Sequence, residues 1–141
     1  MKPIVPCLWF DTEGEEAATL YTSIVPNSRI TDLNAYGVSF ELNGQPYFAL
    51  NGGPQYRFSE AVSFQIFCET QEEVDRYWDA LGEGGEHGPC GWLKDRFGLS
   101  WQIVPTRLTE LLSDPDRERA QRVAACMMRM GKLEIAELEA A

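Results

Sequence analysis

The sequence predicts an α+β fold in which one βαβββ module occurs twice and a helical tail follows. The main observation is an internal repeat: Glu15–Ile24 and Glu72–Leu81 carry apolar residues at the same spacing, and Gly14 is one extra residue in the first copy. In each copy, a short apolar run precedes this helical pattern and hairpin-forming strands follow it. The 141 residues are predicted to form one domain, with module 1 at about 1–54, module 2 at about 60–105 and the tail at 106–141.

The first copy opens with a predicted strand over residues 3–10, where two prolines mark an edge or entry. Thr12 and Glu15 have the spacing of a capping box, which predicts the start of a helix. The apolar stripe of that helix consists of Ala17, Leu20, Tyr21 and Ile24. Three strands are predicted after it, at 28–34, 38–42 and 47–51, and Asn43-Gly44 predicts a tight hairpin between the last two.

The second copy begins with the apolar strand 61–68 and a second capping box at Thr70 and Glu73. The helical stripe after it consists of Val74, Tyr77, Trp78 and Leu81. A glycine-rich polar link over 82–91 leads to the apolar run 90–93, and 94–98 is predicted to be a hairpin connection. In the strand that follows, Ser100, Gln102 and Val104 alternate with Leu99, Trp101 and Ile103, so the two sets face opposite ways.

The tail is predicted to be helical over 108–112, 114–130 and 133–138. Ser113 is expected to cap the second of these helices, with Pro115 in its first turn. The apolar face of that helix consists of Ala120, Val123, Ala124, Met127 and Met128. This face could act as a lid over a ligand, but packing against the sheet or a second subunit is the favoured interpretation.

Composition and charge limit the classes of partner. The formal net charge is −10 and no basic face is visible, which argues against nucleic acid and against anionic membrane surfaces. No apolar run is long enough to span a membrane, and the N-terminus lacks the features of a signal peptide. The four cysteines contain no CxxC motif, which favours free buried thiols in a reducing compartment and therefore a cytoplasmic location.

Four strings in fixed order carry a resemblance to a known family: CLWFDTEGEEAATLY, FALNGGPQYRFSEAVSFQIFCETQEEVD, CGWLKDRFGLSWQIVP and LLSDPDRERAQRV. They resemble the PhnB-like branch of the vicinal-oxygen-chelate superfamily, which includes glyoxalases and bleomycin-resistance proteins. The resemblance extends over nearly the whole chain, tail included. It implies two βαβββ modules that form an incomplete barrel around a cleft, commonly in a homodimer. Members of this branch often bear the description "3-demethylubiquinone-9 3-methyltransferase domain".

The resemblance also indicates where a metal would bind, because metal-dependent members place His or Glu on the first and last strands of each module. The matching positions by strand alignment are Val5, Ala49, Ser63 and Gln102, none of which is a good ligand for a divalent transition metal. The only histidine, His87, is expected to be a solvated residue in a polar loop. We therefore expect no metal and no other cofactor.

The cleft is expected to carry neutral polar groups between aromatic walls, which is typical of a pocket for a small ligand. The predicted ligand-binding residues are Trp9, Asn51, Ser63, Gln65, Phe67, Ser100 and Gln102. By strand alternation Cys7, Ala49 and Val104 face the same way. The alternative is a filled interior in which the amides bond to one another and to the backbone. The cysteines have no histidine beside them, so they are expected to be structural, and Asp95 and Glu69 are candidate general bases.

Three functions follow from these observations. The favoured one is a metal-free small-molecule-binding protein of the PhnB-like branch with no assigned substrate. One alternative is an enzyme that acts on a quinone or aromatic substrate, although no strand leads into the glycine-rich loop that most S-adenosylmethionine enzymes use. The other alternative is a drug-sequestering dimer, for which the acidic surface would suit a cationic ligand. We expect a homodimer because the tail carries more apolar surface than one open sheet needs.

Overall fold

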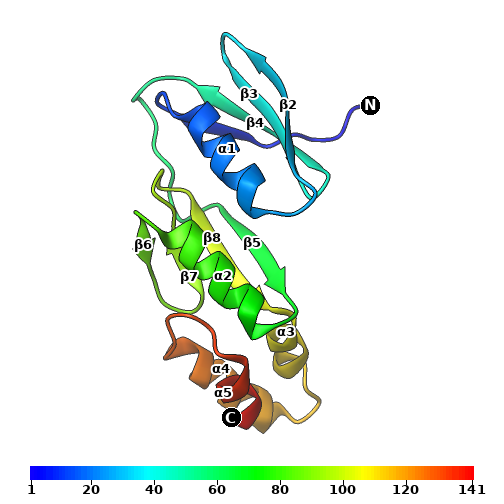
Figure 1. The fold of residues 1–141 in the computed structure, drawn as a ribbon. Helices are drawn as coiled ribbons and strands as arrows, with labels where there is room; N and C mark the ends of the chain where they lie inside the picture. The colour runs from blue at the N-terminus through cyan, green and yellow to red at the C-terminus, as the bar shows by residue number, and fades with distance from the viewer. The chain divides into compact units, whose positions relative to one another are not determined.

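The computed structural model describes all residues, 1–141, and the chain forms two compact units, Met1–Phe58 and Ser59–Ala141 (Figure 1). Each unit contains one βαβββ module with its own four-stranded sheet, and the second unit also contains the C-terminal helices. The α+β class and the duplicated module are therefore confirmed. The predicted single domain, which concerns how the two units combine, stays a prediction.

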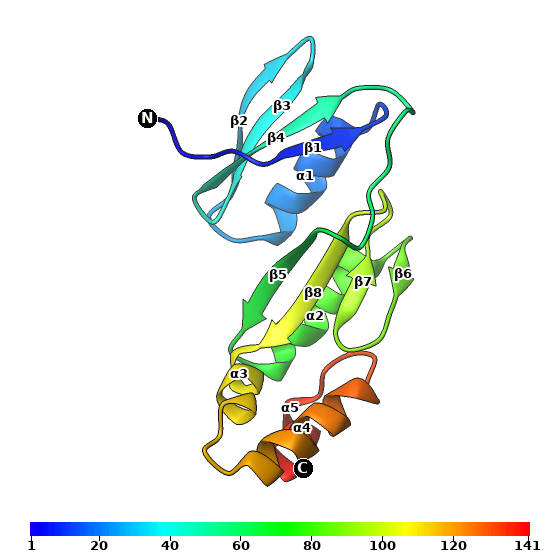
Figure 2. The same cartoon turned by 180° about the vertical axis from the view of Figure 1, so that it is seen from behind.

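The first unit consists of β1 (Cys7–Phe10), α1 (Gly14–Ile24), β2 (Arg29–Asn34), β3 (Gly37–Leu42) and β4 (Gln45–Asn51). The strand order is β1-β4-β3-β2, with a parallel β1–β4 pair and antiparallel neighbours elsewhere. Helix α1 covers one face of this sheet, and from behind the strands lie in front of it (Figure 2). The predicted Asn43-Gly44 hairpin is confirmed, since both residues have the positive φ angles that a tight two-residue turn requires.

The start of α1 differs from the prediction. The first strand begins at Cys7 rather than at residue 3, and the helix begins at Gly14, so Thr12 does not cap it. The Asn51 side chain at the end of β4 takes the place of a local cap, and its Oδ1 accepts a hydrogen bond from the Gly14 N–H at 2.8 Å. A side chain distant in sequence therefore satisfies a helix N-terminus that the neighbouring residues leave open.

The second unit begins with β5 (Ser63–Cys68), α2 (Gln71–Gly82), β6 (Glu86–His87), β7 (Trp92–Lys94) and β8 (Ser100–Pro105). The strand order is β5-β8-β7-β6, again with one parallel pair, β5–β8. Here the predicted cap is confirmed, because Thr70 Oγ1 accepts from the Glu73 N–H and Glu73 reaches back to the Glu69 N–H. The short strand β6 lies in the stretch predicted to be only a polar link.

All four apolar stripe residues of α2 are buried, as the spacing predicts. They cover the face of the sheet that carries Leu93, Leu99, Trp101 and Ile103, each at most 2% exposed. The alternation along β8 is therefore confirmed, and Ser100 and Gln102 belong to the face opposite α2. No helix of the second module covers that opposite face.

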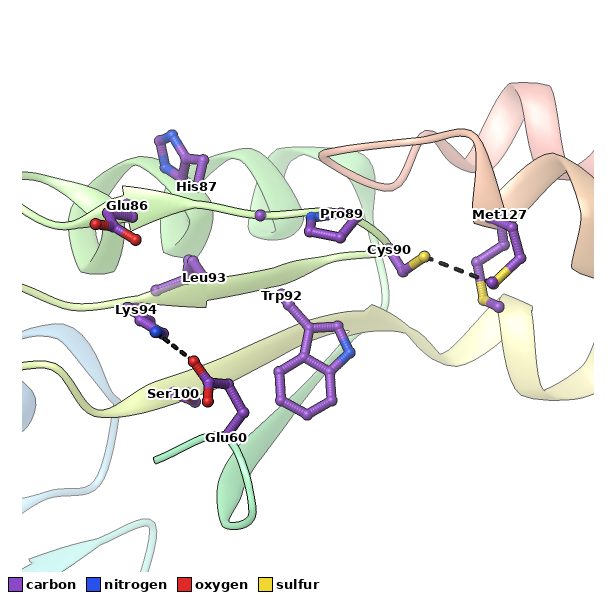
Figure 3. A pocket seen from close by; sticks show the side chains of 12 residues that line it. Glu60, Glu86, His87, Pro89, Cys90, Trp92, Leu93, Lys94, Ser100 and Met127 are labelled. Carbon is purple, nitrogen blue, oxygen red and sulfur yellow. Dashed lines mark hydrogen bonds and ion pairs between the residues drawn. The ribbon is translucent and has the colours of Figure 1, made fainter. Parts of the chain in front are cut away.

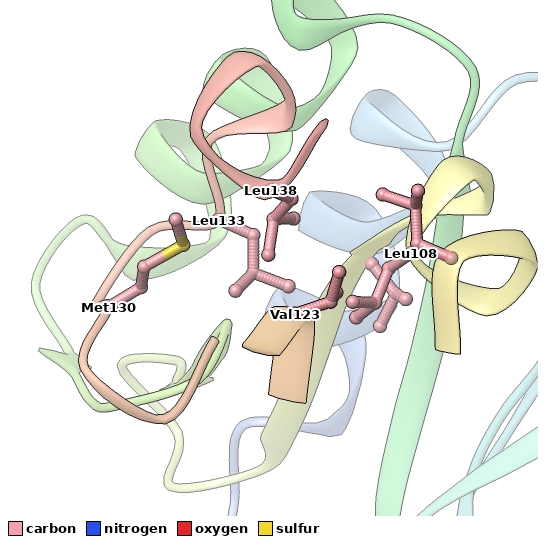
Figure 4. Close-up of a cluster of buried hydrophobic side chains, with 7 residues drawn as sticks. Leu108, Val123, Met130, Leu133 and Leu138 are labelled. Atoms are coloured by element: carbon pink, nitrogen blue, oxygen red, sulfur yellow. The ribbon is translucent and has the colours of Figure 1, made fainter. Parts of the chain in front are cut away.

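The C-terminal helices are α3 (Thr106–Leu112), α4 (Arg117–Met128) and α5 (Ile135–Ala140). The prediction that Ser113 caps the second helix is wrong: Asp116 caps α4, and its Oδ1 accepts from the N–H groups of Glu118 and Arg119. The three helices and the connection between α4 and α5 form a hydrophobic cluster with the last part of β8 (Figure 4). Its buried members are Val104, Leu108, Leu111, Val123, Met130, Leu133 and Leu138.

Two predictions about buried side chains need correction. All four cysteines are free, but only Cys68 is fully buried, and Cys7 is exposed because it lies on the sheet face opposite α1. Met128, predicted to belong to a packed apolar face, is 66% exposed. No helix in the chain is both long enough and apolar enough to cross a membrane.

Candidate ligand-binding site

The face of the second sheet opposite α2 carries three cross-strand rows of side chains. The registers place Ser63 beside Ser100 and Lys94, then Gln65 beside Gln102 and Trp92, and finally Phe67 beside Val104. Because neighbouring residues at matching register project from the same face of a sheet, these side chains form one surface. The surface changes from hydroxyl and ammonium groups, through amides and an indole, to purely apolar groups.

The middle of this surface is a short chain of hydrogen bonds between neutral groups. Gln102 Nε2 donates to Ser63 Oγ at 2.8 Å, and Gln65 Nε2 donates to Gln102 Oε1 at 3.5 Å. The first bond has good length and fixes the Gln102 amide, whereas the second lies at the limit of hydrogen-bonding distance. The alternative of amides bonded to one another therefore describes these three residues, and Gln65 at the outer end is exposed.

Ser100 is the exception among these polar groups. It is 1% exposed, and its Oγ has no hydrogen-bond partner. The residue lines a groove of about 630 Å³ in the second unit (Figure 3). The side chains that project along the groove come from β6, β7, β8, α4 and two loops: Glu60, Glu86, His87, Pro89, Cys90, Trp92, Leu93, Lys94, Ser100, Met127 and Met128, with Gly88 completing the lining.

One end of the groove is charged. Lys94 forms an ion pair with Glu60, and Glu86 is the register partner of Lys94 on the neighbouring strand β6. The hydrogen bond from Lys94 lowers the pKa of the Glu60 carboxyl, and the same bond raises the pKa of the Lys94 ammonium. Both groups therefore stay charged through the neutral range, and one ammonium faces two carboxylates.

Asp95, a candidate general base in the sequence, has a structural role instead. It is 2% exposed, and its carboxylate accepts from the N–H groups of Phe97 and Leu99 and from Trp101 Nε1, at 2.9, 3.0 and 2.9 Å. These bonds fix the connection between β7 and β8, and with it the spacing of Trp92 and Ser100 on the opposite face. Glu69 is exposed beside the N-terminus of α2, outside the groove lining.

In the first unit, the residues that share the sheet face opposite α1 differ from the prediction. Trp9 lies opposite α1 and its Nε1 donates to the Gly53 carbonyl at 2.9 Å. Ala49 and Asn51 were expected on the same face, but Ala49 is fully buried beside Leu8 and Val38, and Asn51 caps α1. The β4 residues beside Cys7 and Trp9 are Phe48 and Leu50. Asn51 therefore does not belong with the other predicted ligand-binding residues.

The residues at the positions where superfamily members bind metals do not fit a metal. On the second sheet these are the hydroxyl of Ser63 and the amide of Gln102, which bond to each other. Val5 precedes β1, and Ala49 faces the helix. No group of three or more His, Cys, Asp or Glu side chains gathers in the chain. His87 lies on strand β6 and not in a loop: its ring stacks on Trp78 at 4.4 Å, and its Nε2 contacts the Trp78 carbonyl oxygen at 2.9 Å.

Three residues that the structure brings to this surface were not predicted from the sequence: Trp92, Lys94 and Glu60. Trp92 and Lys94 could have been found by pairing the two strands that flank the predicted hairpin at 94–98, since that register places them beside Gln102 and Ser100. Glu60 lies in a loop before β5, and no periodic signal locates it.

Comparison with known proteins places these observations in a family. The family model described as 3-demethylubiquinone-9 3-methyltransferase matches residues 2–104, which excludes the tail that the sequence resemblance had included. No curated protein matches the chain. The PhnB protein from Bacillus cereus is 29% identical, with a TM-score of 0.65, over 74% of this chain and 100% of that one.

Two more distant structures show the same fold. A protein from Pseudomonas aeruginosa is 19% identical, with a TM-score of 0.59, over 74% of this chain and 98% of that one. The fosfomycin resistance protein FosX from Mesorhizobium loti is 14% identical, with a TM-score of 0.58, over 80% of this chain and 99% of that one. With two βαβββ modules and a family model that covers most of its length, the chain belongs to the 3-demethylubiquinone-9 3-methyltransferase family, the PhnB-like branch of the vicinal-oxygen-chelate superfamily.

Proposed function

We propose that this protein is a metal-free small-molecule-binding protein whose ligand occupies the face of the second sheet opposite α2. The observation that carries the proposal is the uneven bonding of Gln102. Its amide nitrogen is held by Ser63 at 2.8 Å, while its carbonyl oxygen has only the long contact from Gln65 at 3.5 Å. A ligand N–H or O–H can replace Gln65 as the donor to Gln102 Oε1. This replacement costs little free energy, because a hydrogen bond at 3.5 Å is weak.

The surroundings support an organic ligand. Phe67 is 52% exposed and Trp92 is half-buried, so apolar and aromatic surface lies on both sides of the amides. Sites for small organic molecules combine such surface with a few fixed polar groups. Serine and glutamine at the metal positions supply neutral oxygen atoms, which are poor ligands for divalent transition metals.

Methyl transfer, which the family description suggests, is not supported by the residues present. Each sheet is mixed. The connections from β1 into α1 and from β5 into α2 contain Glu13 and Glu69 and no glycine-rich loop, and β8 leads directly into α3. A binding loop for S-adenosylmethionine of the usual kind follows a strand of a parallel sheet at a helix N-terminus. We derive no step that uses this methyl donor.

A homodimer in the cytoplasm remains part of the proposal. The apolar surface of the tail, on which the dimer was predicted, packs largely into its own cluster. Val62, which immediately precedes the edge strand β5 and is 63% exposed, is a better candidate for a contact between copies. Sedimentation at micromolar concentration tests this, and a monomeric mass would contradict it. The free cysteines support a reducing compartment.

The binding proposal is tested by thermal-shift and calorimetric titration with quinones, S-adenosylmethionine, divalent metals and glycopeptides. An organic compound should stabilise the protein, and Gln102→Leu should weaken its binding by about tenfold, because a fixed acceptor is lost. Gln45→Leu, at an exposed glutamine in the first unit, is the matched control and should have no effect. Stabilisation by a metal alone, or by S-adenosylmethionine alone, would refute the proposal.

A further inference from the structure

We propose that the groove beside α4 binds planar aromatic molecules that carry one positive charge. This inference rests on the proposed small-molecule function, and it names a specific groove and a ligand class. The groove runs from the Lys94–Glu60 ion pair at one end, past Trp92, to Cys90 and Met127 at the other (Figure 3). Its volume of about 630 Å³ is within the range of sites for drug-sized molecules.

The charged side chains at one end of the groove indicate the charge of the ligand. Glu60, Glu86 and Lys94 are the charged side chains in the lining, so the groove has an excess of one negative charge. Lys94 is engaged by Glu60, which leaves the Glu86 carboxylate as the group with capacity for another cation. An anionic ligand would meet two carboxylates and one ammonium that is already paired, so charge complementarity favours a cation.

The Trp92 indole in the middle of the groove indicates that the ligand is planar. Trp92 is half-buried on the same face as Gln102, and its indole provides a large flat surface and one N–H donor. A delocalised cation that stacks on an indole gains both stacking and cation–π attraction. No charged side chain lines the groove beyond Trp92, so an aromatic body can extend in that direction.

Sulfur-containing side chains line the far end of the groove. Cys90 Sγ lies 3.8 Å from Met128 Sδ, and Met127 lines the same end. Backbone bonds from Cys90 N to the Met130 carbonyl and from Gly91 N to the Gly131 carbonyl, both 2.8 Å, hold the segment that follows α4 against the residues that precede β7. Thioether side chains adapt their shape and make favourable contacts with ring edges. These methionines come from the segment that the family model does not match.

The unpartnered Ser100 hydroxyl is the second, independent observation that points to a ligand. A buried hydroxyl without a partner is unfavourable, and native structures seldom keep one without a reason. Ser100 is the register partner of Lys94, which places its hydroxyl at the charged end of the groove. A ligand ammonium or amine N–H near Glu86 can donate to Ser100 Oγ and satisfy it.

The test is calorimetric titration of the full chain with 9-aminoacridine, a planar cation, and with 9-anthracenecarboxylate, a planar anion of similar size. We expect the cation to bind at least tenfold more tightly. Ser100→Ala should weaken its binding about two- to tenfold without loss of stability, because the hydroxyl has no partner to lose. Glu86→Gln should weaken it about two- to fivefold, as expected for a rim charge, and Glu72→Gln on the exposed side of α2 is the control.

Equal binding of cation and anion, or binding of the cation that neither Ser100→Ala nor Glu86→Gln changes, would overturn the inference. The two proposals can fail separately. If a neutral compound binds and Gln102→Leu weakens its binding by about tenfold while 9-aminoacridine does not bind, the groove inference is wrong and the proposed function stands. If 9-aminoacridine binds with the expected Ser100 and Glu86 dependence but is unaffected by Gln102→Leu, the groove is the site and the placement on the amides is wrong.

Discussion

Replacement of Asp95 by alanine gives the sharpest test of how the second unit is held together. The carboxylate is almost fully buried and accepts three hydrogen bonds, from two backbone N–H groups of the hairpin and from the Trp101 indole. All three donors lie within six residues of it, so one side chain fixes both the turn and the buried tryptophan. Without this acceptor, the three donors lose the hydrogen bonds that the carboxylate accepts.

The expected magnitude follows from those donors. The bonds to Leu99 N and Trp101 Nε1 are buried, and the bond to Phe97 N is partly buried. Each buried donor left unsatisfied costs about 1–3 kcal/mol, so Asp95→Ala should lower the free energy of unfolding by about 3–5 kcal/mol. That is a large share of the roughly 5–15 kcal/mol that stabilises a typical domain. Asp95→Asn keeps one acceptor oxygen and should lose about half as much.

The assay is urea unfolding followed by tryptophan fluorescence and circular dichroism. Asp79→Asn, at an exposed aspartate on α2, is the matched control and should change the free energy of unfolding by less than about 0.5 kcal/mol. If Asp95→Ala costs less than about 1 kcal/mol, the carboxylate neither organises the hairpin nor sets the spacing of Trp92 and Ser100.

Three further predictions follow from single contacts. Asn51→Ala should destabilise the chain by about 1 kcal/mol, measured by urea unfolding, because the Gly14 N–H at the start of α1 loses the Asn51 oxygen that it bonds to. Burial raises the pKa of the Cys68 thiol to about 11 from 9.0, so its contribution to stability is complete below pH 9 and is lost between pH 9 and 11. As the pH rises from 9 to 11, the free energy of unfolding of the wild type should therefore fall by up to about 3 kcal/mol more than that of Cys68→Ala, measured by urea unfolding at each pH. Gln71 donates to the Leu133 carbonyl and accepts from Ile135 N, so Gln71→Leu should speed amide exchange in α5, while exchange in α2 stays unchanged.

The two helix starts show which part of the fold the sequence could predict. The cap of α2 is local: Thr70 and Glu73 are three residues apart and bond as the spacing predicts. The same motif at Thr12 and Glu15 is not used, because the inserted Gly14 begins the helix and Asn51 reaches its N–H from 37 residues away. Local motifs predict helices well, but a cap supplied by a distant strand depends on tertiary structure that a sequence window does not contain.

The candidate site was predictable where strand register could be inferred. Ser63, Gln65 and Gln102 share a face because β5 and β8 pair in parallel without a shift. In the first unit, strand alignment predicted that Ala49 and Asn51 lie on the sheet face opposite α1. In the structure that face carries Phe48 and Leu50, so the prediction was out of phase by one residue. Because side chains alternate along a strand, an error of one residue moves every side chain to the other face.

The C-terminal segment explains why the groove itself could not be predicted. The apolar stripe of α4 was expected to pack on the sheet or on a second subunit, yet Val123 at its centre lies in a cluster made mainly by the helices themselves, and Val104 is the member that comes from β8. Backbone bonds at Cys90 and Gly91, just before β7, hold the segment that follows α4, and no side-chain pattern encodes these bonds. Met128 is thereby held at the groove at 66% exposure, although burial would be favourable for its side chain. An exposed methionine at one end of the groove and a buried hydroxyl without a partner at the other are the arrangement expected of a surface that a ligand completes.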